Sequence, residues 1–168
     1  MRSFFATTML YRKSTGEKFK ATWFARLLLK LRYRDLMNIR SFFDSNFTFT
    51  KSVLELPEGY LSWDAALACL KFVSKYVTFL NDDRENWQMP LETASIQRGD
   101  CEDGAILLAN MLSSLGLETV KIVCGALSTG IGHCVVEYNG VQLDWLHLAP
   151  IVKVWFKFSK DEVEICKT

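Results

Sequence analysis

The sequence contains few histidines and prolines, and it lacks closely spaced pairs of cysteines. Among 168 residues there are 2 histidines, 3 prolines and 5 cysteines, and no two cysteines have the Cys-x-x-Cys spacing. The missing spacing excludes a zinc ribbon and a thioredoxin-type redox motif. The sequence also lacks a two-histidine metal motif, which argues against a metal-dependent hydrolase that would combine a histidine with acidic residues.

Long apolar runs, internal repeats and low-complexity segments are absent as well. Near the N-terminus, Thr7 and Thr8 interrupt the apolar residues, and Arg12 and Lys13 follow at once, so no signal-peptide core forms there. No later run approaches the length of a membrane span. Scattered cysteines with apolar neighbours suit a reducing compartment. We therefore expect a cytoplasmic protein without a transmembrane segment.

Positive charge is concentrated near the N-terminus. Residues 1–40 hold 10 Lys and Arg against 2 Asp and Glu, a net of +8, whereas residues 41–168 hold 10 against 17, a net of −7. Apolar residues recur every four positions and predict a basic amphipathic helix over 18–37: Phe19, Trp23, Leu27 and Leu31. This helix either binds an anionic surface or a protein partner, or packs on the domain with its charges in water. The packing interpretation is favoured, and no specific nucleic-acid partner is predicted because no aromatic and glycine motif accompanies the helix.

The order of patterns predicts an α+β fold. Helical periodicity begins at Ser62 and again at Asp100, and the second helix is apolar around most of its circumference, which indicates a central, buried helix. From Leu117 onward the period changes to two and predicts an antiparallel sheet. We divide the chain into an N-terminal basic helical extension over 1–60, packed on the core, and a main domain over 61–168. The length favours one compact unit overall.

A cysteine lies at the start of the central helix, in the stretch Gly99-Asp100-Cys101-Glu102-Asp103-Gly104. Asp100 is a good N-cap, and Asp103 completes a capping box. A thiol in the first turn has its pKa lowered because unpaired backbone N–H groups point at the sulfur. The neighbouring carboxylates oppose this effect, so a nearby imidazolium is needed to stabilise the thiolate.

The hairpin register brings a histidine and an aspartate together. Asn139-Gly140 between two apolar runs predicts a two-residue turn, in which Tyr138 pairs with Val141. Side chains two residues apart share a face of a strand, so His133 and Asp144 become diagonal neighbours about 7 Å apart. A nucleophile, a base and a group that orients the base are therefore expected in Cys101, His133 and Asp144.

These residues resemble the transglutaminase-like cysteine peptidase superfamily, in particular its bacterial branch. The resemblance covers roughly residues 76–146 and rests on the following motifs: Gly-Asp-Cys-Glu-Asp at 99–103, Ala-Ile-Leu-Leu at 105–108, Gly-His at 132–133, Leu-Asp-Trp at 143–145 and the lead-in at 87–93. It implies a papain-like α+β core, with the cysteine on a central helix packed on an antiparallel sheet, here with extra N-terminal helices. Many members carry an aromatic residue where Gly104 stands, so we expect a wider cleft at this position.

The resemblance assigns roles to these residues. It implies Cys101 as nucleophile, His133 as general base and acid, and Asp144 as the group that orients His133. The oxyanion would be held by the Cys101 backbone N–H together with a side-chain donor, for which Trp87 and Gln97 are candidates, although packing and loop roles are favoured for each.

The acidic residues around the cysteine allow two interpretations. Some bacterial relatives bind calcium through carboxylates at this place, and Asp100, Glu102 and Asp103 would supply hard oxygen ligands. The favoured alternative is helix capping with ion pairing to Arg84 or Arg98. No cofactor is required by the proposed chemistry, and calcium is the one that the resemblance allows.

The function expected is thiol-dependent acyl transfer, with a peptide or protein substrate. Hydrolysis by a cysteine peptidase or amidase is favoured over cross-linking because the chain has little room for a dedicated amine-acceptor domain. A transglutaminase or deamidase acting on glutamine side chains, and a non-catalytic interaction module on the same fold, are the alternatives.

Overall fold

A computed structural model describes residues 8–11, 18–21, 36–49, 51–54, 56, 58–81 and 87–166. The helices among them are the 3-10 helices η1 (Leu36–Phe42) and η2 (Lys51–Leu54) and the α-helices α2 (Ser62–Tyr76), α3 (Pro90–Ile96) and α4 (Cys101–Ser114). Two two-stranded sheets are β1 (Thr8–Tyr11) with β2 (Lys18–Ala21), and β3 (Thr78–Phe79) with β4 (Arg98–Gly99).

The main sheet has five antiparallel strands in the order β7-β6-β5-β8-β9. These strands are β5 (Val120–Ala126), β6 (Gly132–Tyr138), β7 (Val141–Leu143), β8 (Lys153–Phe158) and β9 (Val163–Ile165). Successive side chains alternate between two apolar clusters: Ile122, Cys134 and Val136 belong to the cluster that contains α4, whereas Val123 and Val135 belong to a second cluster.

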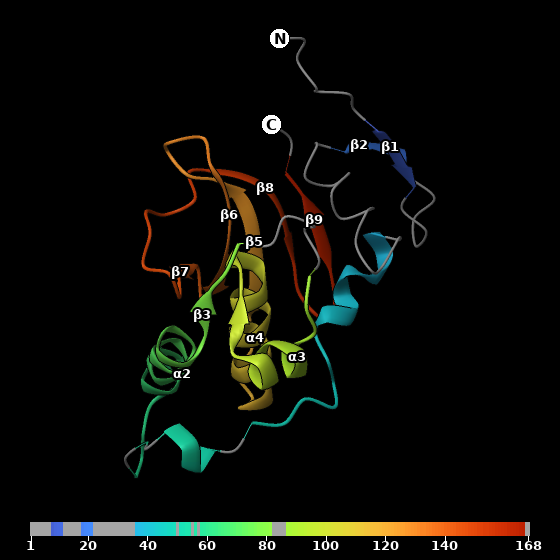
Figure 1. The fold of residues 1–168 in the computed structure, drawn as a ribbon. Helices are drawn as coiled ribbons and strands as arrows, with labels where there is room; N and C mark the ends of the chain where they lie inside the picture. The colour runs from blue at the N-terminus through green and yellow to red at the C-terminus, as the bar shows by residue number, and fades with distance from the viewer. Residues whose placement is uncertain are drawn as a thin grey trace.

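Helix α4 is the centre of the fold. Every residue from Glu102 to Leu112 is buried, as the apolar circumference of this helix predicts. It contacts β5 and β6 on one side and α2 and α3 on the other (Figure 1). The predicted α+β architecture, with a buried helix on an antiparallel sheet, is thereby confirmed.

The hairpin that follows β6 has the predicted turn and register. Asn139 and Gly140 both have positive φ values, 49° and 78°, as a two-residue turn of this kind requires. Tyr138 pairs with Val141 and Val136 with Leu143. The ladder then stops, because β7 ends at Leu143, so the edge of β6 is open before Val136.

The predicted basic helix over 18–37 is wrong at its start. Lys18–Ala21 is a strand that pairs with β1, and Leu36 and Met37 belong to a 3-10 helix. The sequence Lys-Phe-Lys-Ala alternates with a period of two, and this local alternation favours a strand over the four-residue period. Residues 22–35 of the predicted helix, and with them its surface and partner interpretations, lie outside the described residues.

Helix η1 and the segment that follows it pack against the central helix. Ile39, Phe42 and Phe47 are buried in the core. The side-chain amide of Asn110 donates to the backbone oxygen of Phe42 at 2.7 Å and accepts from the backbone N–H of Asp44 at 2.8 Å. This part of residues 1–60 therefore contributes to the same core as α4.

Two further elements, α3 and β4, lie between Trp87 and the central helix. Pro90 begins α3, where its missing N–H costs no helical hydrogen bond, and Gln97 ends it with a φ of 54°. Arg98–Gly99 then pairs in parallel with β3 and delivers the chain to Cys101. Within the described ranges, none of the helices has the length and apolar character needed to cross a bilayer.

Candidate active site

The start of α4 is fixed by a capping box. The carboxylate of Asp100 accepts from the backbone N–H of Asp103, and Oδ2 of Asp103 accepts from the N–H of Asp100 at 3.1 Å. Oδ1 of Asp103 accepts from the N–H of Gln88 at 2.7 Å, which ties the preceding loop to the helix. These contacts agree with the capping interpretation of the two aspartates.

The three carboxylates of this stretch do not form a cation site as placed. Asp103 uses both oxygens for backbone N–H groups, and a carboxylate oxygen of Glu102 faces the Cys101 thiol. In the part of the chain that the structure describes, no group of three or more His, Cys, Asp or Glu side chains is arranged to hold a metal ion. A pairing with Arg84 lies outside the described residues.

The thiol of Cys101 is half-buried and donates to Oε2 of Glu102 at 3.1 Å. Burial, followed by the charge and hydrogen bond of Glu102, raises the pKa of this thiol well above its ordinary value. Burial and the charge of Asp100 also raise the pKa of Glu102. The pKa-lowering effect expected from the helix start is therefore outweighed, first by burial of the thiol and then by the carboxylates of Glu102 and Asp100.

The open edge of β6 meets the sulfur. The Cα atoms of Cys134 and Cys124 are 4.3 Å apart, a spacing typical of a non-hydrogen-bonded pair, so the N–H of Cys134 points away from β5. It points to the side where β7 has already ended, and the backbone N–H of Cys134 lowers the pKa of the Cys101 thiol. Cys101 is therefore influenced by the backbone of β6 at a position that β7 does not pair, one residue after His133.

His133 and Asp144 form the predicted pair. Nε2 of His133 lies 2.9 Å from Oδ2 of Asp144, and only 3% and 11% of the two side chains are exposed. The carboxylate also accepts from the N–H groups of Leu146 and Leu148, each at 2.9 Å. Burial alone would raise the pKa of Asp144, but the hydrogen bonds from His133 and these N–H groups outweigh burial and lower it.

Cys124 and Cys134 form a disulfide across β5 and β6. The sequence does not reveal this pairing, because it follows from the register between two strands that are joined by a loop of unspecified shape. Disulfides persist in oxidising compartments. The cytoplasmic location stays a prediction, and this disulfide argues against it.

The two candidates for the oxyanion side chain differ in placement. Trp87 is completely buried, with its ring against those of Phe42 and Phe158 at centroid distances of 5.2 and 6.0 Å, so its position is that of a core residue. The side chain of Gln97 is exposed, and its backbone oxygen accepts from the N–H of Thr78 at 2.9 Å. A role for Gln97 in the oxyanion site stays a prediction.

Trp145 is a further residue of the site, to which the motif Leu-Asp-Trp at 143–145 assigned no role. Its Nε1–H donates to the backbone oxygen of Cys101 at 3.2 Å, and its ring lies where a side chain at Gly104 would stand. The expectation that Gly104 widens the cleft is therefore wrong, because a residue from the other end of the site fills the space. The adjacent Asp144-Trp145 dipeptide was the available signal.

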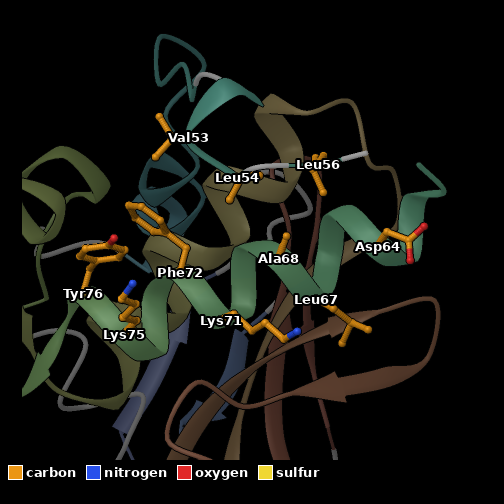
Figure 2. Close-up of a pocket in the computed structure, with 10 residues that line it drawn as sticks. All are labelled: Val53, Leu54, Leu56, Asp64, Leu67, Ala68, Lys71, Phe72, Lys75 and Tyr76. Atoms are coloured by element: carbon orange, nitrogen blue, oxygen red, sulfur yellow. The ribbon is translucent and has the colours of Figure 1, made fainter. Parts of the chain in front are cut away.

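A groove lies on another part of the described structure, away from these residues. It has a volume of about 530 Å³ and runs between η2 and the outer face of α2 (Figure 2). Its walls include Val53, Leu54, Leu67, Lys71, Phe72 and Tyr76. No side chain of the candidate active site lines it, so we do not assign it to the substrate.

Comparison with known proteins identifies the fold. No protein-family model matches the sequence, and no curated protein matches it significantly. Legionella pneumophila LapG superposes with a TM-score of 0.58 at 19% identity, over 68% of this chain and 72% of LapG. Its calcium-bound form gives 0.58 at 20% identity, over 70% and 74%. The chain therefore has the transglutaminase-like, papain-like α+β fold that its sequence predicts.

Proposed function

We propose that this chain is a thiol-dependent acyl-transfer enzyme that hydrolyses a peptide or amide bond of a peptide or protein substrate. Cys101 is the nucleophile, His133 the general base and acid, and Asp144 the residue that orients His133. One observation carries the proposal: His133 is hydrogen-bonded to Asp144 at the open edge of β6, and the backbone N–H of the next residue acts on Cys101 by lowering the pKa of its thiol.

The hydrogen bond to Asp144 selects a tautomer of His133 that can act as a base. When its Nε2–H donates to Asp144, Nδ1 holds the lone pair that accepts a proton. Because the pKa of the Cys101 thiol is raised, the resting nucleophile is a thiol and not a preformed thiolate. His133 then removes the proton as the sulfur attacks, which is general-base catalysis.

The reaction proceeds in two balanced steps. In the first, the S–H bond of Cys101 breaks, its proton passes to His133, the sulfur bonds to the carbonyl carbon, and the C–N bond breaks as the amine takes the proton from His133. In the second, water gives its proton to His133 and its hydroxyl to the acyl carbon, which releases the carboxylic acid and restores the thiol. The Cys101 backbone N–H, in the first turn of α4, is a donor for the oxyanion.

Calcium has no step in this reaction. LapG has a calcium-bound form, but Asp103 of this chain uses its carboxylate oxygens to accept backbone N–H groups. Calcium binding by Asp100, Glu102 and Asp103 stays a prediction of the sequence resemblance, with its own test in the Discussion.

The proposal is tested with a mixture of peptides of defined sequence, incubated with the purified chain and analysed by mass spectrometry in H₂¹⁸O. Hydrolysis places the heavy oxygen in a new carboxylate. A primary amine added in excess traps the acyl-enzyme instead if the chain is a transglutaminase, and conversion of glutamine to glutamate identifies a deamidase.

The matched variants are Cys101→Ala and Cys166→Ala. Both remove a partly exposed free thiol, but only Cys101 lies beside β6. We expect Cys101→Ala to abolish the reaction and Cys166→Ala to leave it unchanged. Equal activity in both variants would contradict the proposal, and a full set of wild-type cellular phenotypes in Cys101→Ala would favour the interaction-module alternative.

A further inference from the structure

Trp145 joins the separate parts of the candidate active site. It follows Asp144 directly in the chain, and its Nε1–H donates to the backbone oxygen of Cys101 at 3.2 Å. Its own backbone oxygen accepts from the hydroxyl of Ser74 on α2 at 2.7 Å. One buried residue, only 3% exposed, therefore connects the loop after β7 with the first turn of α4 and with α2.

The indole ring of Trp145 packs against the backbone of Gly104 on α4. A Cβ atom at this position would overlap Cε2 and Nε1 of Trp145. The absence of a side chain on α4 therefore lets the ring lie directly on the backbone of the helix, one turn after Cys101. The ring centroid of Phe79 on β3 lies 6.5 Å from that of Trp145, with the two ring planes tilted by 45°.

The loop that carries Asp144 has no strand partner of its own. β7 ends at Leu143, and the following residues fold around the Asp144 carboxylate through the N–H groups of Leu146 and Leu148. This turn is closed upon itself, so its position relative to α4 depends on contacts outside the turn. Trp145 supplies such a contact beside the carboxylate.

We propose that Trp145 is a positioning residue, which holds the Asp144–His133 pair and the first turn of α4 in one fixed arrangement. Gly104 provides the space for its ring. The inference rests on the proposed function, since it concerns the same site. Gly104 and Trp145, which are 41 positions apart in the sequence, would together align the base with the nucleophile. The indole N–H adds a second donor to a carbonyl that α4 already uses, so its loss should loosen the attachment of the first turn to the loop after β7 and make Cys101 more accessible but less well aligned.

The test compares Trp145→Phe with Trp155→Phe. Both replace a buried tryptophan, but Trp155 lies on β8, where it contributes to the sheet core. Alkylation by iodoacetamide at pH 8 is followed by mass spectrometry of the peptides that contain Cys69, Cys101 and Cys166. We expect Trp145→Phe to raise the alkylation rate of Cys101 roughly three- to tenfold, which corresponds to the free energy of one hydrogen bond. The alkylation rates of Cys69 and Cys166 should not change. Trp155→Phe should change none of the three rates.

A second pair of variants separates positioning from packing. Gly104→Ala should displace the ring of Trp145 and lower the thermal midpoint of unfolding. The double variant Gly104→Ala with Trp145→Leu removes the overlap and should recover part of the lost thermal midpoint. If Trp145 positions the site, the double variant keeps the accelerated Cys101 rate. An unchanged Cys101 rate in Trp145→Phe, or equal acceleration of all three thiols, would overturn the inference.

A direct probe of the contact is the indole N–H resonance of Trp145. Carbamidomethylation of Cys101 should shift this resonance and leave that of Trp155 in place, and the absence of a shift would count against the inference. These readouts need no substrate. A wild-type chain without peptidase activity would overturn the proposed function and leave the thiol rates to decide the role of Trp145.

Discussion

The Sγ atom of Cys101 lies 3.1 Å from Oε2 of Glu102, the next residue along α4. The nucleophile that we propose therefore shares its proton with a buried carboxylate in the resting structure, and the pKa values of both groups are raised. Proton removal by His133 during attack has to compete with this contact.

Replacement of Glu102 should activate the thiol. In Glu102→Gln the negative charge is lost, so the pKa of Cys101 falls, and the alkylation rate at neutral pH rises by roughly tenfold for each unit of that fall. Glu164→Gln is the control because Glu164 likewise raises the pKa of Cys166. It should raise the alkylation rate of Cys166 and leave that of Cys101 unchanged. An unchanged Cys101 rate in Glu102→Gln would show that burial dominates.

The His133–Asp144 pair should stabilise the fold except in acid. The folded pKa of Asp144 is below its unfolded value of about 4, so its contribution is present above that pH and is lost as the pH falls through the folded pKa. The free energy of unfolding of Asp144→Asn should therefore lie below that of the wild type at pH 6, and the difference should shrink toward pH 2. Urea titrations measure it, with the exposed Asp161→Asn as control. A constant difference would contradict this assignment.

Gly125 should tolerate no side chain. A Cβ atom there would overlap the backbone oxygen of Lys153 and Cγ2 of Ile151, beside the irregular pairing of β5 with β8. We expect Gly125→Ala to cost about 1–3 kcal/mol of unfolding free energy in urea titrations, as overpacking does. Val141→Ala, at an exposed position on β7, should change it by less than about 0.5 kcal/mol. Equal effects of the two variants would be unexpected.

The disulfide predicts a thiol count. Under denaturing, non-reducing conditions we expect three free thiols, Cys69, Cys101 and Cys166. Replacement of both Cys124 and Cys134 by alanine should remove about 2–3 kcal/mol of stability, because the closed loop is short, with a sequence separation of 10. A count of five thiols in protein purified without reductant would contradict the pairing and restore the reducing-compartment interpretation.

Calcium should have little effect on stability. Because the first-turn aspartates are engaged in capping, we expect the thermal midpoint to be the same in EGTA and in millimolar CaCl₂. Magnesium chloride at the same concentration controls for ionic strength. A midpoint that rises with CaCl₂ alone and loses this rise in Asp103→Asn would support the calcium interpretation instead.

Several features of the site could be predicted from short-range rules. The capping box fixes the start of α4 because Asp100 and Asp103 need only each other's backbone N–H groups. The Asn139-Gly140 turn fixes the register, and with it the approach of His133 to Asp144, through hydrogen bonds between residues that are close in sequence. The fold class follows from the same periodicities.

Tertiary structure alone decided the electrostatics and the packing at the cysteine. The burial of the Cys101–Glu102 contact, the position of the Trp145 ring over Gly104 and the bond between Cys124 and Cys134 depend on how α4, β5, β6 and the loop after β7 are placed against one another. Local sequence patterns specify which residues share a helix turn or a strand face. They do not specify how deeply a polar side chain is buried or the distance between residues of different elements, and these two quantities set the pKa values and the overlaps.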